Sequence, residues 1–99
     1  MDINAILEGI KKSAAGADPI GNTLKFVFDG DEVIFIDGTA SENVVSLDDN
    51  EADCQISLSK ENFIKLTTGD LNPMMAVMTG KVKIKGDMSV AMKLQSLIG

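Results

Sequence analysis

The sequence predicts one α+β domain over residues 1–99: a five-stranded, mostly antiparallel sheet with helices packed on one face. Three observations support this. Ninety-nine residues is the length of one ordinary domain, which buries somewhat over ~60% of its extended surface. Apolar and polar side chains alternate in several short segments that turn residues separate. Segments with helical periodicity precede and follow them.

The chain begins with an amphipathic helix. Asp2 is suited to cap it. Gly16 and Pro19 make its continuation beyond about Ala15 unfavourable, so residues 14–23 are expected to form a linker. Its apolar residues recur at the spacing of one buried helix face, at Ile3, Ile6, Leu7 and Ile10.

Three strands joined by short turns are expected next, over residues 24–28, 33–36 and 39–47. The first alternates apolar and polar residues, which is typical of a half-buried strand. The second is continuously apolar, which indicates a strand covered on both faces or near the sheet centre. The third is weaker and depends on Val44 and Val45. Asp37-Gly38 is typical of a hairpin turn.

The second half of the chain adds two strands and three helices. Residues 52–58 alternate again and place Cys54 inward. Ser59 and Asn72 are suited to cap two short helices, and Asp87 to cap the last. Between them, Lys81–Lys85 alternates lysine with β-branched residues, which predicts a strand with one solvated face.

Charge and composition exclude several classes of protein. The net charge of −6 opposes binding to nucleic acid. No apolar run approaches the roughly 18 residues of a membrane span. The N-terminal residues resemble no secretory signal, the C-terminal residues lack the peroxisomal tripeptide, and the single cysteine agrees with a reducing compartment. We therefore expect a cytoplasmic protein.

Few residues in this chain are suited to catalysis. It has no His, Tyr, Trp or Arg, which removes the commonest general base and most metal-ligand sets. Cys54 is expected to be a core residue rather than a reactive thiol. Solvated turn residues and an acid–base pair remain alternatives for Asp29, Asp31, Asp37 and Asp53. We expect no catalytic residue, metal or cofactor.

Methionine is concentrated near the C-terminus, where five of the six methionines lie between Gly69 and Leu94. Methionine is unbranched and polarizable, so it adapts to apolar shapes that vary. Ordinary core filler is the alternative interpretation. Lys81, Lys83 and Lys85 similarly either solvate a strand or attract an anionic lipid surface.

The same region resembles the sterol carrier protein type 2 family. The resemblance covers roughly half the chain closely. Its motifs are Ala52-Asp53-Cys54, Thr68-Gly69 with Asn72-Pro73, Gly80-Lys81-Val82-Lys83 with Gly86 and Met88, and Ala91-Met92-Lys93-Leu94. Together they are much more specific than any one of them.

The resemblance implies a five-stranded sheet covered by helices that enclose an apolar tunnel for a fatty acid, fatty acyl-CoA, sterol or similar lipid. It further implies that the middle helices, the sheet and the last helix wall the tunnel. The ligand-binding residues carried over from it are Phe63, Leu66, Met74, Met75, Met78, Val82, Ile84, Met88, Met92 and Leu97.

The leading functional hypothesis is a non-enzymatic lipid-binding or lipid-transfer domain with transient membrane or enzyme contact. The alternative is an accessory protein-interaction subunit of a lipid-metabolising complex that uses the same apolar groove. A homodimer covering the final helix is a version of this alternative. A third hypothesis is a catalytic domain with an aspartate pair, Asp29 and Asp37.

Overall fold

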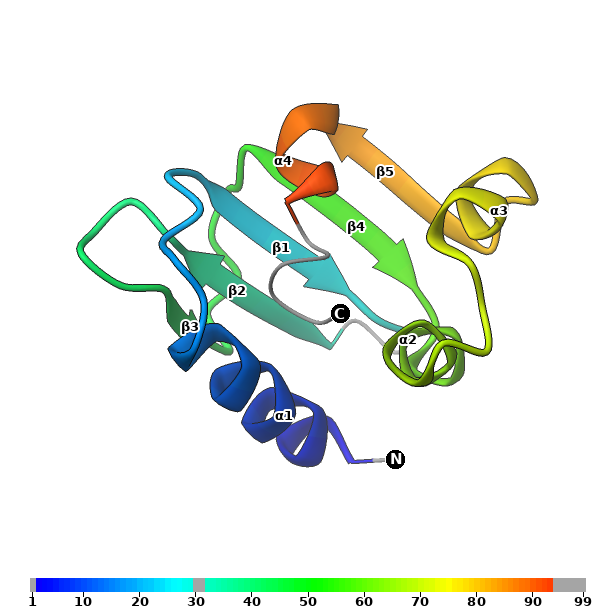
Figure 1. Cartoon of the computed structure of the whole chain (residues 1–99), viewed down its shortest axis with the longest axis horizontal. Helices are drawn as coiled ribbons and strands as arrows, with labels where there is room; N and C mark the ends of the chain where they lie inside the picture. The colour runs from blue at the N-terminus through cyan, green and yellow to red at the C-terminus, as the bar shows by residue number, and fades with distance from the viewer. Residues whose placement is uncertain (1, 30–31, 94–99) are drawn as a thin grey trace.

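The computed structural model describes residues 2–29 and 32–93 (Figure 1). Along the chain lie α1 (Ile3–Ala15), β1 (Thr23–Val27), β2 (Val33–Asp37), β3 (Val44–Ser46), β4 (Cys54–Leu58), α2 (Lys60–Thr68), α3 (Pro73–Met78), β5 (Val82–Gly86) and α4 (Met88–Met92). This order confirms the predicted α+β class. Within the described ranges, no helix has the length and hydropathy needed to cross a membrane.

The five strands form one mixed sheet in the order β3-β2-β1-β4-β5. Three of the four pairings are antiparallel, and β1 pairs with β4 in parallel. Because β3 and β4 lie on opposite sides of β1 and β2, the chain between them crosses the sheet (Figure 1). In that crossing segment, Asp49 forms an ion pair with Lys25 of β1 at 3.0 Å. The carboxylate of Asp53 accepts a hydrogen bond from the Thr23 N–H.

One face of the sheet is apolar and the helices cover it. The register places Phe26 beside Ile34 and Ile56, and Ile56 beside Ile84. These strand residues share one hydrophobic core with residues from the four described helices, namely Ile6, Leu7, Ile10 and Ala14 of α1, Phe63 of α2, Ala76 of α3, and Val90 and Ala91 of α4. The predicted packing of helices on one face is therefore confirmed.

The opposite face carries most of the polar residues of the strands. In β5, Val82 is buried towards the helices, whereas Lys83 and Lys85 are exposed. Lys83 lies beside Ser57 and Lys85 beside Gln55 of β4. The amphipathic strand expected over residues 81–85 is thus present at the sheet edge.

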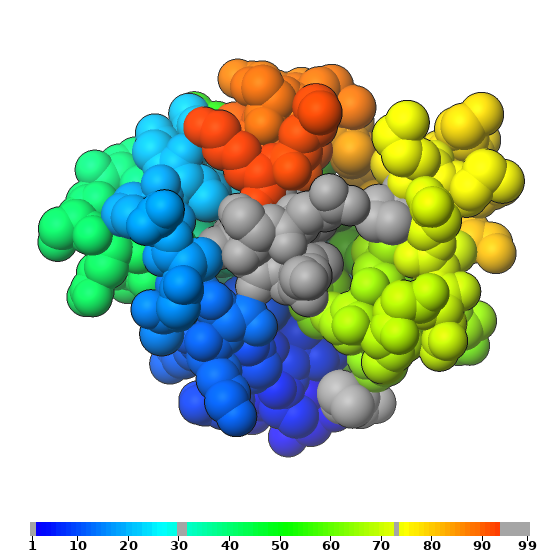
Figure 2. Space-filling view, in the orientation of Figure 1, coloured from blue at the N-terminus to red at the C-terminus, as the bar shows by residue number. Residues whose placement is uncertain are grey.

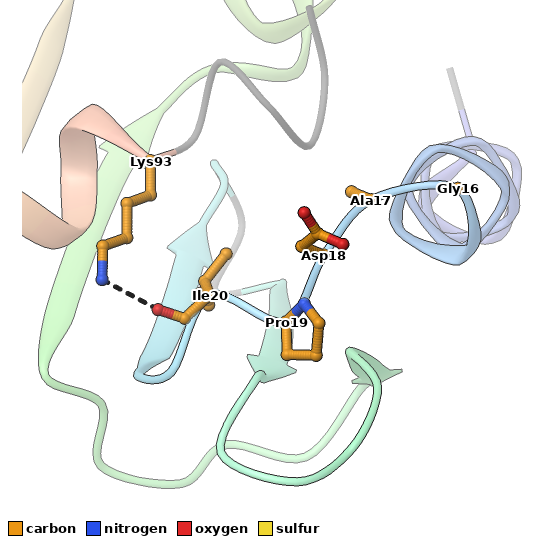
Figure 3. A pocket seen from close by; sticks show the side chains of 6 residues that line it. All are labelled: Gly16, Ala17, Asp18, Pro19, Ile20 and Lys93. Carbon is orange, nitrogen blue, oxygen red and sulfur yellow. Dashed lines mark hydrogen bonds between the residues drawn. The ribbon is translucent and has the colours of Figure 1, made fainter.

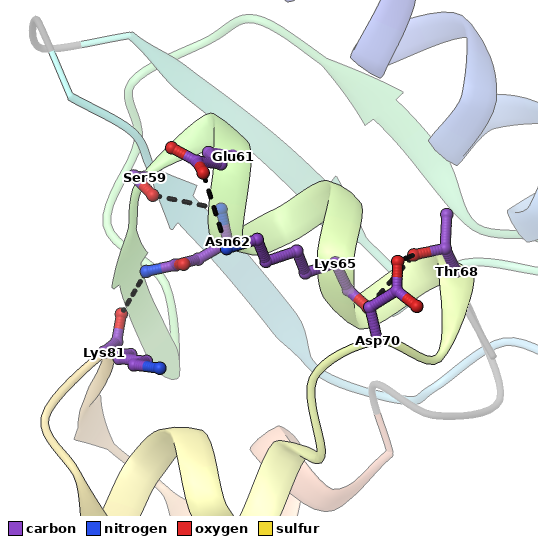
Figure 4. Close-up of polar contacts among 7 residues, drawn as sticks. All are labelled: Ser59, Glu61, Asn62, Lys65, Thr68, Asp70 and Lys81. Atoms are coloured by element: carbon purple, nitrogen blue, oxygen red, sulfur yellow. Dashed lines mark hydrogen bonds and ion pairs between the residues drawn. The ribbon is translucent and has the colours of Figure 1, made fainter.

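Side chains satisfy the free N–H groups at the start of each helix. The side-chain oxygens of Asp2, Ser59, Asn72 and Asp87 accept hydrogen bonds from backbone N–H groups two or three residues later. Figure 4 shows the start of α2, where the Asn62 amide also donates to the Lys81 carbonyl at 3.4 Å. This contact joins α2 to the residue just before β5.

The strand expected over residues 39–47 is shorter than predicted, because β3 covers only Val44–Ser46. Side chains account for the difference. The carboxylate of Asp37 accepts hydrogen bonds from the N–H and hydroxyl of Thr39. Asn43 accepts one from the Ile20 N–H. These bonds replace strand pairing in the first half of the segment.

Candidate functional site

An aromatic cluster joins α2 to the centre of the sheet. The Phe63 ring of α2 lies edge-on to Phe26 and Phe28, with centroid distances of 5.4 and 5.5 Å. Edge-to-face geometry places the positive rim of one ring against the negative face of another. Because Ser59 caps α2 and Gly69 ends it in the left-handed conformation, Phe63 is held at a fixed place above β1.

Four of the ten predicted ligand-binding residues belong to the hydrophobic core or pack against it. Phe63 and Val82 are buried in the core, each 5% exposed. Leu66 and Ile84 are partly buried and pack against the same core. These four residues, two on α2 and two on β5, belong to or pack against the same core, and we call them the apolar wall.

The five predicted methionines lie at the surface. Met74, Met78 and Met92 are each more than 70% exposed, and Met75 and Met88 are both 54% exposed. α3 and α4 are short and direct small residues inward, Ala76 from α3 and Val90 and Ala91 from α4. Leu97 lies outside the described residues.

Two hollows lie elsewhere, beside the linker that follows α1. One of about 450 Å³ is lined by Gly16–Ile20 and Lys93 (Figure 3). A neighbouring hollow of about 540 Å³ adds the end of α1, the segment before β3 and the first two residues of β3. None of the nine predicted residues that the structure describes lines either hollow. Asp18 and Lys93 contribute charged groups, so for an apolar ligand we favour the wall at Phe63 over these hollows.

α4 is attached to the sheet at both of its ends. Before its first turn, the Asp87 N–H donates to the Asp53 carbonyl at 2.9 Å. After its last turn, the Lys93 ammonium donates to the Ile20 carbonyl at 2.8 Å and to the Asn22 side chain at 3.0 Å (Figure 3). Sequence analysis missed this role of Lys93, because its partners lie more than 70 residues away in the chain.

The described carboxylates considered for catalysis each accept hydrogen bonds from a different segment of the chain. Asp29 accepts a hydrogen bond from the Lys60 N–H, Asp37 from Thr39, and Asp53 from Thr23. Asp31 lies outside the described residues. Hydrogen bonds from the hydroxyl and N–H of Thr39 hold the pKa of Asp37 below its ordinary value.

Cys54 is fully buried on the apolar face of β4. Burial raises the pKa of its thiol, and the nearby charge of Asp87 raises it further. Both effects favour the neutral thiol over the nucleophilic thiolate. In the described part of the chain, no group of three or more Cys, Asp or Glu residues is placed to hold a metal ion.

Relatives in sequence match about half of this chain. A 55-residue stretch is 46% identical to human sterol carrier protein 2 and covers 56% of this chain and 10% of that protein. The matched stretches span 9% to 12% of the length of the curated relatives.

Solved structures match almost the whole chain. Sterol carrier protein 2 like 2 from Aedes aegypti superposes with a TM-score of 0.78 at 20% identity and covers 97% of this chain and 95% of that one. Sterol carrier protein 2 from the same organism, in complex with the C16 fatty acid palmitate, gives a TM-score of 0.71 at 20% identity, with 95% and 91% covered.

The family model for the SCP-2 sterol transfer family matches residues 3–99. This range includes every described helix and strand, and with them the residues of the apolar wall. The chain belongs to the SCP-2 sterol transfer family.

Proposed function

We propose that this chain binds a fatty acid, a fatty acyl-CoA or a sterol-like lipid between the apolar face of its sheet and its helices, and carries it without catalysing a reaction. The observation that carries the proposal is the apolar wall of Phe63, Leu66, Val82 and Ile84, which all belong to or pack against one core. The palmitate complex of the Aedes aegypti protein supports this class of ligand.

The two sides of the proposed site differ in how easily they can move. The sheet side is fixed by strand pairing and by the aromatic cluster. On the other side, α3 reaches the core through Ala76 alone, and α4 reaches it through Val90 and Ala91 between its two attached ends. The methionines of these helices have three rotatable bonds, so small helix shifts would let them line a ligand as the movable wall.

Energetics favour such a movable wall over a rigid empty cavity. An empty apolar cavity of about 400 Å³ would cost on the order of 10 kcal/mol at ~24 cal/mol per Å³, which is comparable with the whole stability of a small domain. The site is therefore expected to be filled by lipid or closed by its own side chains. Affinity would come mainly from buried apolar area, at roughly 25 cal/mol per Å².

The side chains present in this chain are poorly suited to catalysis. The chain has no His, Tyr, Trp or Arg, its only thiol is buried, and the aspartates hold separate backbone groups. General acid–base catalysis needs a positioned group with a pKa near the working pH. The pKa of Asp37 is lowered, away from that range.

Native mass spectrometry with palmitate tests the proposal. The purified protein should carry lipid or take up one palmitate at micromolar concentration. Ile84→Asn should weaken uptake roughly tenfold or more, because it places an unpaired amide in the apolar wall. Leu47→Asn, the same kind of change at an exposed site near the opposite sheet edge, should leave uptake unchanged.

Absence of both bound lipid and palmitate uptake would contradict the proposal. The accessory-subunit alternative predicts a different result, namely that Met92→Lys abolishes capture of a partner protein by a chain that never takes up lipid. Met92 is 77% exposed, so this substitution should leave the fold intact.

A further inference from the structure

All positively charged side chains of this chain are lysines, and the structure describes each of them. The chain has nine lysines and no arginine or histidine, and none of the nine belongs to residues 1, 30–31 or 94–99. A charged head group that leaves water costs much free energy unless an opposite charge pairs with it. The positions of the nine lysines therefore decide which lipid head groups the site holds.

Three lysines of the sheet lie on its polar face. Side chains alternate along a strand, so Lys83 and Lys85 point away from the helices that cover the buried Val82. Lys25 of β1 lies on the same polar face, because both it and Lys85 lie beside Gln55 of β4 in the register. The sheet therefore separates these three lysines from the helix-covered face, which Figure 2 shows with α1 in blue and α2 in yellow-green.

Five more lysines lie at the surface or pair with glutamates. Lys11 and Lys12 of α1 and Lys81 before β5 are exposed. Lys60 and Lys65 of α2 form ion pairs with glutamate side chains. Within the described ranges no polar or charged residue is buried, so none of these ammonium groups lies inside the core.

The ninth lysine, Lys93, borders a hollow but is held by oxygens of the protein (Figure 3). Its ammonium donates to the Ile20 carbonyl at 2.8 Å and to the Asn22 side chain at 3.0 Å. It also acts on Asp87, whose pKa is lowered mainly by hydrogen bonds from Ser89 and further by the charge of Lys93. A ligand carboxylate would have to compete with these groups for the Lys93 ammonium.

Acidic residues offset the lysines in both hollows. The hollow at Gly16–Ile20 is lined by Lys93 and Asp18, so its two charges cancel. In the neighbouring hollow, Lys11 shares the lining with Asp18 and Glu42, which leaves an excess of negative charge. The net charge of −6 adds long-range repulsion of an anion. Neither hollow thus provides a cationic pocket for a carboxylate or a phosphate.

We infer that the site prefers lipids with an uncharged head group, such as a long-chain alcohol or a sterol-like body, over anionic lipids of the same chain length. The inference rests on the proposed function and narrows its ligand class. A hydroxyl group leaves water at low cost when it donates one hydrogen bond to a carbonyl oxygen. The carboxylate of a fatty acid and the phosphates of an acyl-CoA have to stay in water at the mouth of the site, or lose their charge.

Competition between three lipids of the same chain length tests this preference. Palmitate, hexadecanol and palmitoyl-CoA are offered together to the purified chain below their micelle concentrations, and native mass spectrometry measures the bound fractions. At about pH 8 the carboxyl group of free palmitate is ionised. Bound hexadecanol should then exceed bound palmitate at least about tenfold, and palmitoyl-CoA should be bound least because it carries the most charge.

Lys93→Met tests whether Lys93 binds the head group, and Lys12→Met is the control that removes the same charge from an exposed site on α1. Because Lys93 attaches α4 to the linker, its substitution lowers uptake of both lipids to the same degree, and the ratio of palmitate to hexadecanol is the readout. This ratio should stay within about twofold of that of the unmodified chain in both variants. A fall of about tenfold for Lys93→Met alone would show that Lys93 anchors the carboxylate, and would overturn the inference.

The pKa of bound palmitate gives an independent test. With palmitate isotope-labelled at its carboxyl carbon, an NMR titration of the complex measures this pKa directly. Burial and neighbouring acids disfavour the charged form, so the pKa should be raised above its value in water. Palmitate binding should strengthen as the pH falls through the raised pKa, whereas hexadecanol binding stays constant. A lowered pKa would reveal a cation beside the head group and would contradict the inference.

The outcomes separate this inference from the proposed function. Binding of palmitate or palmitoyl-CoA in preference to hexadecanol at about pH 8 contradicts only the preference for uncharged lipids. Uptake of none of the three lipids contradicts the proposed function, and the preference falls with it.

Discussion

The sheet wall and the helices α3 and α4 are both apolar, but they place their side chains in different environments. The wall uses aromatic and branched residues, of which Phe63 and Val82 are buried and Leu66 and Ile84 are partly buried. The two short helices carry five methionines, and all five are exposed. Branched and aromatic side chains have few rotamers and specify one packing, whereas methionine tolerates several. The molecule therefore combines a fixed wall with the exposed methionines of α3 and α4, which we call the adaptable rim.

Phe63→Ala should give the largest loss of stability. Phe63 joins α2 to Phe26 and Phe28, and its truncation leaves a cavity at the centre of the core. We expect the free energy of unfolding to fall by about 3–5 kcal/mol. Urea unfolding followed by circular dichroism measures it. A loss below about 1 kcal/mol would show that the wall is as adaptable as the rim.

Gly86→Ala should be next in size, because it disturbs the edge of the fixed wall. Gly86 has φ of +105°, and a Cβ there would lie 2.5 Å from the carbonyl oxygen of Asp53. Strain and clash together should cost roughly 2–3 kcal/mol in the same urea experiment.

Gly80→Ala is the matched control for this change. Gly80 also has a positive φ, of +77°, but nothing lies within 4 Å of its added Cβ. It should therefore cost only the conformational strain, about 1 kcal/mol. Equal losses at the two glycines would show that the contact with Asp53 is not tight.

How far the sequence predicts this structure depends on the range of the interactions. All four helix starts were predicted, because the capping bonds of Asp2, Ser59, Asn72 and Asp87 reach only two or three residues along the chain. The inward side of the strands was predicted from their two-residue alternation. The parallel pairing of β1 with β4 was not, because it depends on contacts about 30 residues apart.

The site was only partly predictable for a related reason. Phe63 and Val82 were expected at the site because of the family resemblance, and the structure buries both in the core. The six residues of α3 contain four large apolar side chains and one alanine, so no periodicity shows that Ala76 turns inward. That the four large apolar residues of α3 take part in ligand binding remains a prediction.

Asp87→Asn should have a smaller effect that depends on pH. The Ser89 hydroxyl and N–H hydrogen bonds hold the pKa of Asp87 below its ordinary value of 3.8. A lowered pKa contributes stability that is present above the ordinary value and is lost as the pH falls through the folded-state pKa.

Asparagine caps a helix about as well as aspartate, so Asp87→Asn should preserve α4 but reduce the loss of stability on acidification below about pH 4. Urea unfolding at neutral pH and in acid checks this. The same acid dependence in the variant and the unmodified chain would exclude Asp87 as its source.

Met78→Ser should have the smallest effect on stability. Met78 is 78% exposed, so its loss should change the free energy of unfolding by no more than about 0.5 kcal/mol. A loss near that of Phe63→Ala would mean that the methionine rim is part of the rigid core in solution.

Contacts between bound lipid and protein test most directly the claim that the fixed wall faces the ligand. Nuclear Overhauser effects from labelled palmitate to the side chains of Phe63, Val82 and Ile84 can be recorded on the intact chain. The account predicts contacts from the acyl chain to all three residues. Contacts confined to the hollow at Gly16–Ile20 and Lys93, with none to the wall, would contradict it.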